Sequence, residues 1–161
     1  MAYQKLQVGL AASVIPSDTI QIPVPGSSEI SGTNTGPVAV NTLKDSTAPF
    51  TSDELKAGAI VLNETDGTLA KVTSVNSASE LTLSADIFTG TGKNYVVYLL
   101  PELNRSQGCV IYCGSTGNIK VETTSGSIVT YTGVPTGIFL PVQVYKVFAT
   151  GTTATNLVAN W

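Results

Sequence analysis

The last 39 residues of the chain, Thr123 to Trp161, carry a single charged side chain, that of Lys146. Nine of these residues are threonine, and valine, isoleucine, phenylalanine and tyrosine recur among the rest. Residues that are β-branched or aromatic favour strands. A surface so poor in charge is poorly soluble, so we expect much of the segment to be buried, in its own core or against other chains. The segment therefore predicts a β-rich module for packing and assembly.

The composition of all 161 residues extends this expectation to the whole chain. Charged residues make up 12% of it, about half the usual share of a soluble domain, and uncharged polar residues take their place. This balance is typical of an all-β protein with neutral polar faces. The net charge is −3 with no basic run, which argues against nucleic-acid binding because phosphates are neutralised by clustered Lys and Arg. No apolar run approaches the roughly 20 residues that span a membrane.

Charge divides the chain into parts. Residues 45–100 contain seven acidic and three basic side chains, whereas the rest contains four acidic and five basic ones. The acidic stretch also holds four or five short strands separated by compact turns, which is typical of a small barrel or meander. We therefore expect an all-β fold with a discontinuous β-sandwich or jelly-roll-like body, residues 1–44 and 101–161. A small acidic β-barrel, residues 45–100, is expected to be inserted into it.

Alternation of apolar and polar residues predicts individual strands. In the body they are expected at residues 1–15, 19–24, 38–43, 109–113, 119–123, 128–132, 140–150 and 152–161. In the insert they are expected at residues 59–62, 69–75, 81–84 and 95–100. Residues 27–36 read as an exposed loop rich in Gly, Ser and Thr. Residues 140–150 alternate little, so both faces of that strand should be covered. Thr51 to Glu54 resembles a helix-capping box that can start one turn at most, because Gly58 follows.

Catalytic signatures are missing from the sequence. It contains no histidine, so Ser-His-Asp and Cys-His arrangements are impossible, and no lysine follows a serine by three positions. Gly90 to Asn94 superficially resembles a phosphate loop, but it lacks the earlier glycine and leads into a strand. Asn63 to Gly67 lacks the alternating ligands of a calcium loop and is better read as a hairpin turn. Asp53 and Glu54 are more simply the first turn of a short helix than a carboxylate pair for glycoside hydrolysis.

Cys109 and Cys113 lie on one face of an expected strand, about 13 Å apart at the usual rise per residue. That is too far for a disulfide between them, and no metal site is expected without histidine or a second cysteine pair. We interpret both as buried free thiols. The sequence thus gives no catalytic, cofactor-binding or metal-binding residue, and no cofactor is expected.

Aromatic residues offer one further kind of site. Several could line a sugar-binding face, although ordinary core and cross-strand positions explain them better. The residues concerned are Tyr95, Tyr98, Tyr112, Tyr131, Tyr145 and Phe148. Trp161 could anchor on a neighbouring subunit or close the chain's own fold, and the sequence leaves both alternatives open.

The C-terminal segment resembles a group of small tailed-phage virion proteins, which include head decoration proteins and the head spike base proteins of phages and gene transfer agents. The resemblance is carried by residues 109–114, Val121 with Gly126, residues 133–141, and residues 144–159 around Gly151-Thr152-Thr153-Ala154. Pro16 to Thr19 is similar to the opening of the same family. About eighty residues intervene where compact members have few. Part of this insert, residues 57–83, is similar to a small β-barrel of other capsid-decorating proteins, through residues 58–61, 66–67 and 72–75.

The resemblance implies a non-enzymatic virion protein that decorates or stabilises the head by binding the major capsid protein lattice. It also implies a symmetric homo-oligomer, with a trimer favoured, made in the bacterial cytoplasm and located on the outer surface of the phage head. From the charge division, we expect the body to contact the shell and the acidic barrel to project outward. The alternatives are a head spike or fibre base that grips a fibre or spike protein, and a module that binds host glycans.

Overall fold

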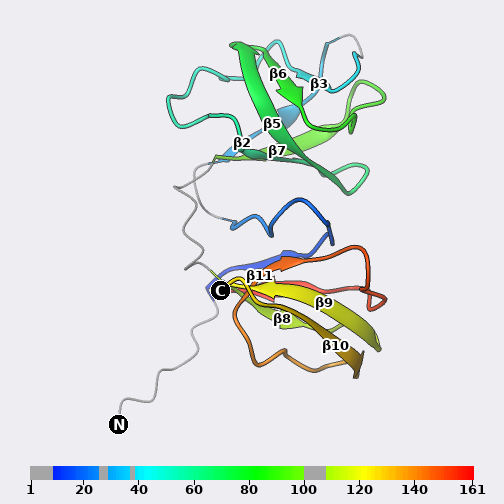
Figure 1. Ribbon diagram of the computed structural model, residues 1–161. Coiled ribbons are helices and arrows are strands. Elements are labelled where there is room, and N and C mark those ends of the chain that lie inside the picture. The colour runs from blue at the N-terminus through cyan, green and yellow to red at the C-terminus, as the bar shows by residue number, and fades with distance from the viewer. Residues whose placement is uncertain (1–8, 26–28, 37–38, 100–107) are drawn as a thin grey trace. The chain divides into compact units, whose positions relative to one another are not determined.

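The computed structural model describes residues 9–25, 29–36, 39–99 and 108–161, which form strands and connecting turns (Figure 1). The chain divides into two compact units. Unit 1 comprises Met1–Pro25 and Asn104–Trp161, and unit 2 comprises Gly26–Leu103. Within the described ranges there is no helix, and hence none that could cross a membrane. The all-β fold class is therefore confirmed.

Unit 1 contains two antiparallel three-stranded sheets, in the orders β1-β12-β8 and β10-β9-β11. The first sheet is built from β1 (Ala11–Ser13), β12 (Val158–Asn160) and β8 (Val110–Tyr112). The second is built from β10 (Ile128–Val134), β9 (Gly117–Thr123) and β11 (Val144–Val147). Both sheets supply side chains to one core cluster, including Ile111 and Ala159 from the first and Ile119, Val121 and Val147 from the second. Unit 1 is thus a small β-sandwich.

The β9–β10 hairpin forms where the sequence predicts it. Ile119, Val121 and Thr123 are buried as their alternation predicts, but Glu122, expected on the exposed face, is buried as well and pairs with Lys146. Gly126 makes the turn with a φ of 89°, a value that glycine adopts without a steric penalty. The register of β10 then shifts between Tyr131 and Val134, so the strand ends in a β-bulge.

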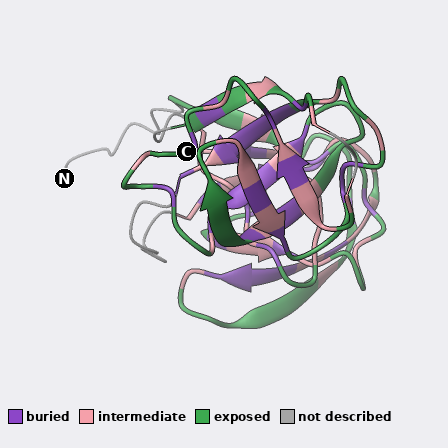
Figure 2. Cartoon of the chain, turned by 90° about the horizontal axis from the view of Figure 1, so that it is seen from above, coloured by how far each residue is buried: buried purple, intermediate pink, exposed green. Residues whose placement is uncertain are grey.

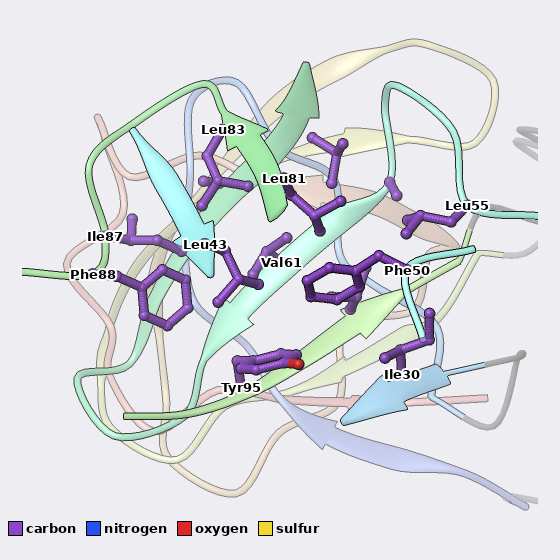
Figure 3. Packing of buried hydrophobic residues seen from close by; sticks show 14 of the residues in the cluster. Ile30, Leu43, Phe50, Leu55, Val61, Leu81, Leu83, Ile87, Phe88 and Tyr95 are labelled. Carbon is purple, nitrogen blue, oxygen red and sulfur yellow. The ribbon is translucent and has the colours of Figure 1, made fainter. Parts of the chain in front are cut away.

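Unit 2 contains one six-stranded antiparallel sheet, in the order β2-β7-β4-β5-β6-β3. Its strands are β2 (Glu29–Thr33), β3 (Thr42–Lys44), β4 (Ile60–Asn63), β5 (Thr68–Ser77), β6 (Glu80–Leu83) and β7 (Asn94–Tyr98). The N–H groups of Thr35 and Gly36 donate to the Lys44 carbonyl at 2.9 and 3.4 Å. These bonds join the ends of the two edge strands, so the sheet curls into a half-barrel. Its core includes Leu43, Phe50, Val61 and Phe88 (Figure 3).

The first boundary between the units differs from the expected one. The sequence placed residues 1–44 in the body, but β2 and β3 belong to the sheet of unit 2 and the boundary follows Pro25. β2 pairs with β7 over five residues and buries Ile30. The expected loop at residues 27–36 thus contains a strand, which its Gly, Ser and Thr content concealed because pairing and burial override weak propensity. The expected return link, residues 101–107, lies outside the described residues.

Several of the expected strands in unit 1 are shorter or missing. Of the strand expected at residues 1–15, the first eight residues lie outside the described part, and the rest forms only β1. β11 covers only residues 144–147 of the long strand expected at 140–150, and β12 covers only residues 158–160 of the expected 152–161. Pro141 has no backbone N–H to donate to a neighbouring strand, and Gly151 turns the chain with a φ of 97°. Pro141 lies within the long strand that was expected, and Gly151 directly follows it. Residues 19–24 form no strand, although Ile20 and Ile22 are buried as their alternation predicts. Buried residues lie mainly in strands and exposed residues mainly in the connections (Figure 2).

Candidate interaction surface

The outer edge of β11 is covered by other parts of unit 1. The N–H of Ser17 donates to the Val147 carbonyl at 2.9 Å, and that of Ile22 donates to the Tyr145 carbonyl at 3.1 Å. Cys109 and Val144 exchange two backbone hydrogen bonds of 3.0 and 2.8 Å. The segment after β1 therefore lies along β11 and occupies its hydrogen-bonding groups.

The outer edge of β8 is covered in the same way. The N–H of Cys113 donates to the Ile138 carbonyl, and the N–H of Leu140 donates to the Ile111 carbonyl, both at 2.9 Å. β1, at the far edge of that sheet, has only three residues. Neither edge of the β1-β12-β8 sheet thus offers a long run of unpaired backbone.

β10 differs from these strands. It lies at the edge of its sheet (Figure 1), and within the described residues β9 is its one strand partner. At the start of the hairpin the N–H of Thr123 donates to the Ser127 carbonyl at 2.9 Å. Because bonding direction alternates along an antiparallel pair, the backbone of Val129 also faces β9. The backbone groups that face away from β9, here named the open edge, belong to Ile128, Thr130 and Thr132.

The side chains of β10 leave this open edge unprotected. Ile128 and Val129 are 57% and 40% exposed, and the strand contains no charged residue and no proline. Natural edge strands are usually short, charged, interrupted by proline or covered. The bulge after Tyr131 is the one such device on β10. The sequence predicts the strand at residues 128–132 but not its open edge. The signal for that edge is an uncharged hairpin strand that begins with two adjacent β-branched apolar residues.

A second exposed apolar group, here named the Phe139 patch, lies along the covered edge of β8. Ile138 and Phe139 are 47% and 51% exposed. The Phe139 ring contacts the Tyr112 ring with 5.2 Å between centroids and an interplanar angle of 59°. An aromatic pair that is held in place at the surface can bind an apolar partner with little loss of conformational freedom.

The charged side chains of unit 1 that the structure describes gather in one place. They form a charged cluster of Asp18, Lys120, Glu122 and Lys146. Lys146 Nζ lies 3.1 Å from Glu122 Oε2. The Nζ atoms of Lys120 and Lys146 lie over the Phe148 ring, 4.9 and 4.3 Å from its centroid, respectively. Thr150 donates its N–H and hydroxyl to Asp18 at 2.9 and 2.7 Å, which lowers the pKa of Asp18. The open edge and the Phe139 patch themselves carry no charge.

The two units differ in net charge more than the two parts defined from the sequence. Unit 2 contains nine acidic and four basic side chains, a net charge of −5, whereas unit 1 contains two acidic and four basic ones, a net charge of +2. The acidic character therefore belongs wholly to unit 2. A partner with a negative surface would be repelled by unit 2 and not by unit 1.

The loop that superficially resembled a phosphate site is tied to its neighbours in unit 2. The buried side chain of Asn34 donates to the Gly90 carbonyl and accepts from the Lys93 N–H, both at 2.7 Å. Lys93 Nζ lies 2.8 Å from Asp66 Oδ1, so its charge is paired. This ion pair lowers the pKa of Asp66. The lysine of the loop thus serves a structural contact.

The loop considered for calcium forms the β4–β5 hairpin turn. Asn63 is fully buried and donates to the Ile87 carbonyl at 2.6 Å and to Asp66 Oδ2 at 2.9 Å. The Gly67 N–H donates to the Asn63 carbonyl at 2.9 Å, and Gly67 has a φ of 65°. The hairpin reading is confirmed. Among the described residues, no three metal-ligating side chains gather where they could hold an ion.

The aromatic residues considered for sugar binding are spread over both units. Tyr95 is fully buried in unit 2, between Phe50 and Phe88, with ring centroids 6.1 and 6.3 Å away (Figure 3). Its ring therefore cannot contact a sugar. Tyr112 stacks on Phe139, as described above, and Tyr131 packs against the core of unit 1. Trp161 also packs against that core, which is the second of the two roles expected for it.

Tyr95 holds a buried carboxylate. Its hydroxyl donates to Asp45 Oδ2 at 2.7 Å, and Thr47 donates its N–H and hydroxyl to Asp45 Oδ1 at 2.9 and 2.7 Å. Burial alone would raise the pKa of Asp45, but these hydrogen bonds outweigh it and hold the pKa below its usual value. Burial and the Asp45 charge raise the pKa of Tyr95. A Cβ on Gly32 would lie 2.6 Å from Asp45 Oδ2, so glycine there leaves room for the pair.

Both cysteines are free and buried, as the sequence predicts. Cys109 donates to the Val144 carbonyl at 3.4 Å, and burial raises the pKa of its thiol to about 12. A thiol with so high a pKa is poorly reactive near neutral pH, because the thiolate is the nucleophile.

Comparisons with family models, with curated proteins and with solved structures found no match for this chain. The resemblance to tailed-phage virion proteins therefore stays a prediction from the sequence. The most unusual features in the described residues of unit 1 are two uncharged parts of its surface, the open edge and the Phe139 patch.

Proposed function

We propose that the chain is a non-enzymatic structural protein of a tailed-phage virion, which binds the major capsid protein lattice and decorates or stabilises the head. The proposal combines the sequence resemblance with one observation. Unit 1 exposes uncharged apolar side chains, and its described charges lie in one cluster in which Lys146 is paired with Glu122. Such a surface can be buried against other chains without burying a charge that lacks a partner.

The Phe139 patch is the part of this surface that we assign to the shell contact. Aromatic side chains are enriched among the residues that dominate binding energy at interfaces. Ile138 and Phe139 are half-exposed, and the backbone of Ile138 is already fixed by its bond from Cys113. A partner would therefore meet a preformed patch.

Unit 2 is assigned to the solvent side. Its net charge of −5 makes burial against a protein surface costly, because buried charges need partners. An acidic outer layer would also keep assembled particles apart by repulsion. This orientation keeps the expectation that the body contacts the shell, with the division now placed after Pro25.

A pelleting assay tests the proposal. Full-length protein is mixed with purified heads of a phage whose genome encodes it, and the bound fraction is measured after centrifugation. We expect saturable pelleting, and we expect Phe139→Ser to weaken the affinity at least tenfold. Val40→Ser is the control, because Val40 is 76% exposed in unit 2 and should have no effect. If the chain stays in the supernatant at all concentrations, the proposed function is wrong.

Deletion of unit 2 tests the assigned orientation. The deletion has to remove residues 26–103, because a cut after Lys44 would separate β2 and β3 from their sheet. We expect the shortened protein, once circular dichroism shows it to be folded, to pellet with heads as the full chain does. Loss of pelleting by a folded variant would instead assign the contact to unit 2. Capture of a fibre protein by the full chain, lost on the same deletion, would favour the spike or fibre base.

A further inference from the structure

We infer that β10 of one chain pairs antiparallel with β10 of a second copy, which joins two three-stranded sheets into one of six strands. The inference goes beyond the proposed function, because it names the strand through which two copies of the chain would meet. Its basis is the open edge, a row of backbone donors and acceptors on a strand of seven residues. Such a row is a template for another strand.

Within unit 1, the other strand edges are already covered or short. Backbone bonds from Ser17 and Ile22 cover β11, and bonds with Ile138 and Leu140 cover β8. β1 is only three residues long. In the described part of unit 1, a second copy thus has one long open edge to offer, and that edge is β10 itself. Pairing a strand with its own copy makes an isologous contact with two-fold symmetry.

The alternation of hydrogen bonds also gives the register. Residues of the open edge must lie opposite one another, because only their backbone groups point outward. The register that uses all three of them places Thr130 opposite Thr130 of the second copy. Ile128 then lies opposite Thr132, and Val129 lies opposite Tyr131. The last pair sets a β-branched side chain against an aromatic one, a combination that stabilises antiparallel strands.

Charge does not oppose this pairing. β10 has no charged side chain, so no like charges meet across the two-fold axis. The nearest charged strand is β9, with Lys120 opposite Thr130. The two β9 strands would be three strand spacings apart, about 14 Å, which exceeds the screening length of about 8 Å at physiological salt. Glu122 is already paired with Lys146 within its own chain.

The mass of the purified chain tests the inference first. Sedimentation equilibrium of the full-length protein, without heads, should give a dimer. Thr130→Pro should give a monomer, because it removes an outward N–H while leaving the bonds to β9 in place. Ile128→Lys should also give a monomer, and it tests the β10 pairing if the proline variant does not fold. Val40→Lys, the same kind of change at an exposed site of unit 2, should stay dimeric.

Cross-linking tests the register. Thr130→Cys should form a covalent dimer on mild oxidation, because the two Thr130 residues face each other within the Cα distances that disulfides allow. Thr132→Cys is the control on the same strand and face, and there the two cysteines would lie about 13 Å apart. The native cysteines are buried and should not interfere. Cross-linking of Thr132→Cys in preference to Thr130→Cys would overturn the register.

The outcomes separate this inference from the proposed function. A monomeric or trimeric wild-type protein overturns the β10 pairing, and so does a dimer that neither Thr130→Pro nor Ile128→Lys disrupts. None of these results bears on pelleting with phage heads, which is measured on the same protein. The trimer that the sequence resemblance implies cannot be built from one two-fold contact alone, so the mass also decides between these two expectations.

Discussion

Asp45 shows how a single residue constrains the core of unit 2. Its carboxylate is almost wholly buried, yet each oxygen accepts at least one hydrogen bond, from Tyr95 or Thr47. These bonds connect β7 to the segment after β3. Gly32 on β2 lies beside both groups and has no room for a side chain. The sequence marks Tyr95 only as one aromatic residue among several.

Loss of the Tyr95 hydroxyl should destabilise the protein. Tyr95→Phe removes one bond to a buried carboxylate, so we expect the free energy of unfolding to fall by about 1–3 kcal/mol. Urea unfolding followed by fluorescence or circular dichroism measures the change. Tyr98→Phe, at a half-buried tyrosine on the same strand, should change it by less than about 0.5 kcal/mol. Equal effects of the two substitutions would contradict the role given to the pair.

The lowered pKa of Asp45 predicts acid sensitivity. The folded state binds the Asp45 proton less tightly than the unfolded state, whose pKa is near the usual 3.8. Its stabilising contribution is therefore present above about pH 4 and is lost as the pH falls through the lower folded pKa. We expect Asp45→Asn to be less stable than the wild type at pH 7 and to lose less stability on acidification. Urea midpoints between pH 7 and pH 2 check this, and a wild-type midpoint that does not fall in acid would refute it.

At the scale of elements, some segments of this chain could be predicted from sequence and others could not. The β9–β10 hairpin was predictable because Ile119 and Val121 alternate with charged residues up to a Ser-Gly turn. β2 was missed because Ser31, Gly32 and Thr33 have the composition of a loop, and only pairing with β7 makes them a strand. The open edge was also hidden, because which edges are covered depends on contacts between segments far apart in the sequence.

The loops of unit 2 depend on Asn34. Asn34→Ala removes both side-chain bonds to residues 90–93, so we expect a loss of about 2 kcal/mol and faster amide hydrogen exchange in that loop. Asn76→Ala is the matched control, because the side chain of Asn76 also makes hydrogen bonds but lies exposed on β5. Its loss should cost less than about 0.5 kcal/mol. Unchanged exchange at residues 90–93 in Asn34→Ala would show that the loop is held by other contacts.

At the scale of the whole molecule, each of the two units has its own hydrophobic core and its own net charge. The cluster of unit 1 and that of unit 2 share no residue. The sequence predicted an acidic insert and a near-neutral discontinuous body, because charge counts need no structure. It misplaced the first boundary, since nothing in residues 26–44 distinguishes the two sheets before their pairing is known.

Separate cores predict separate responses to core substitutions. Val121→Ala should lower the stability of unit 1 by roughly 2–3 kcal/mol and Leu81→Ala that of unit 2 by about 2–5 kcal/mol. Both residues are fully buried. Hydrogen exchange should then rise only in the unit that carries the substitution. A rise throughout the chain in both variants would mean that the two units unfold together.

A reconstruction of intact virions is the most direct test of the assembly role. Particles of a phage whose genome encodes the chain should show density for unit 1 on the outer surface of the head, in contact with the major capsid protein. Unit 2 should lie farther from the shell. Absence of the chain from the particles, or density for it only at the tail, would contradict the proposed function.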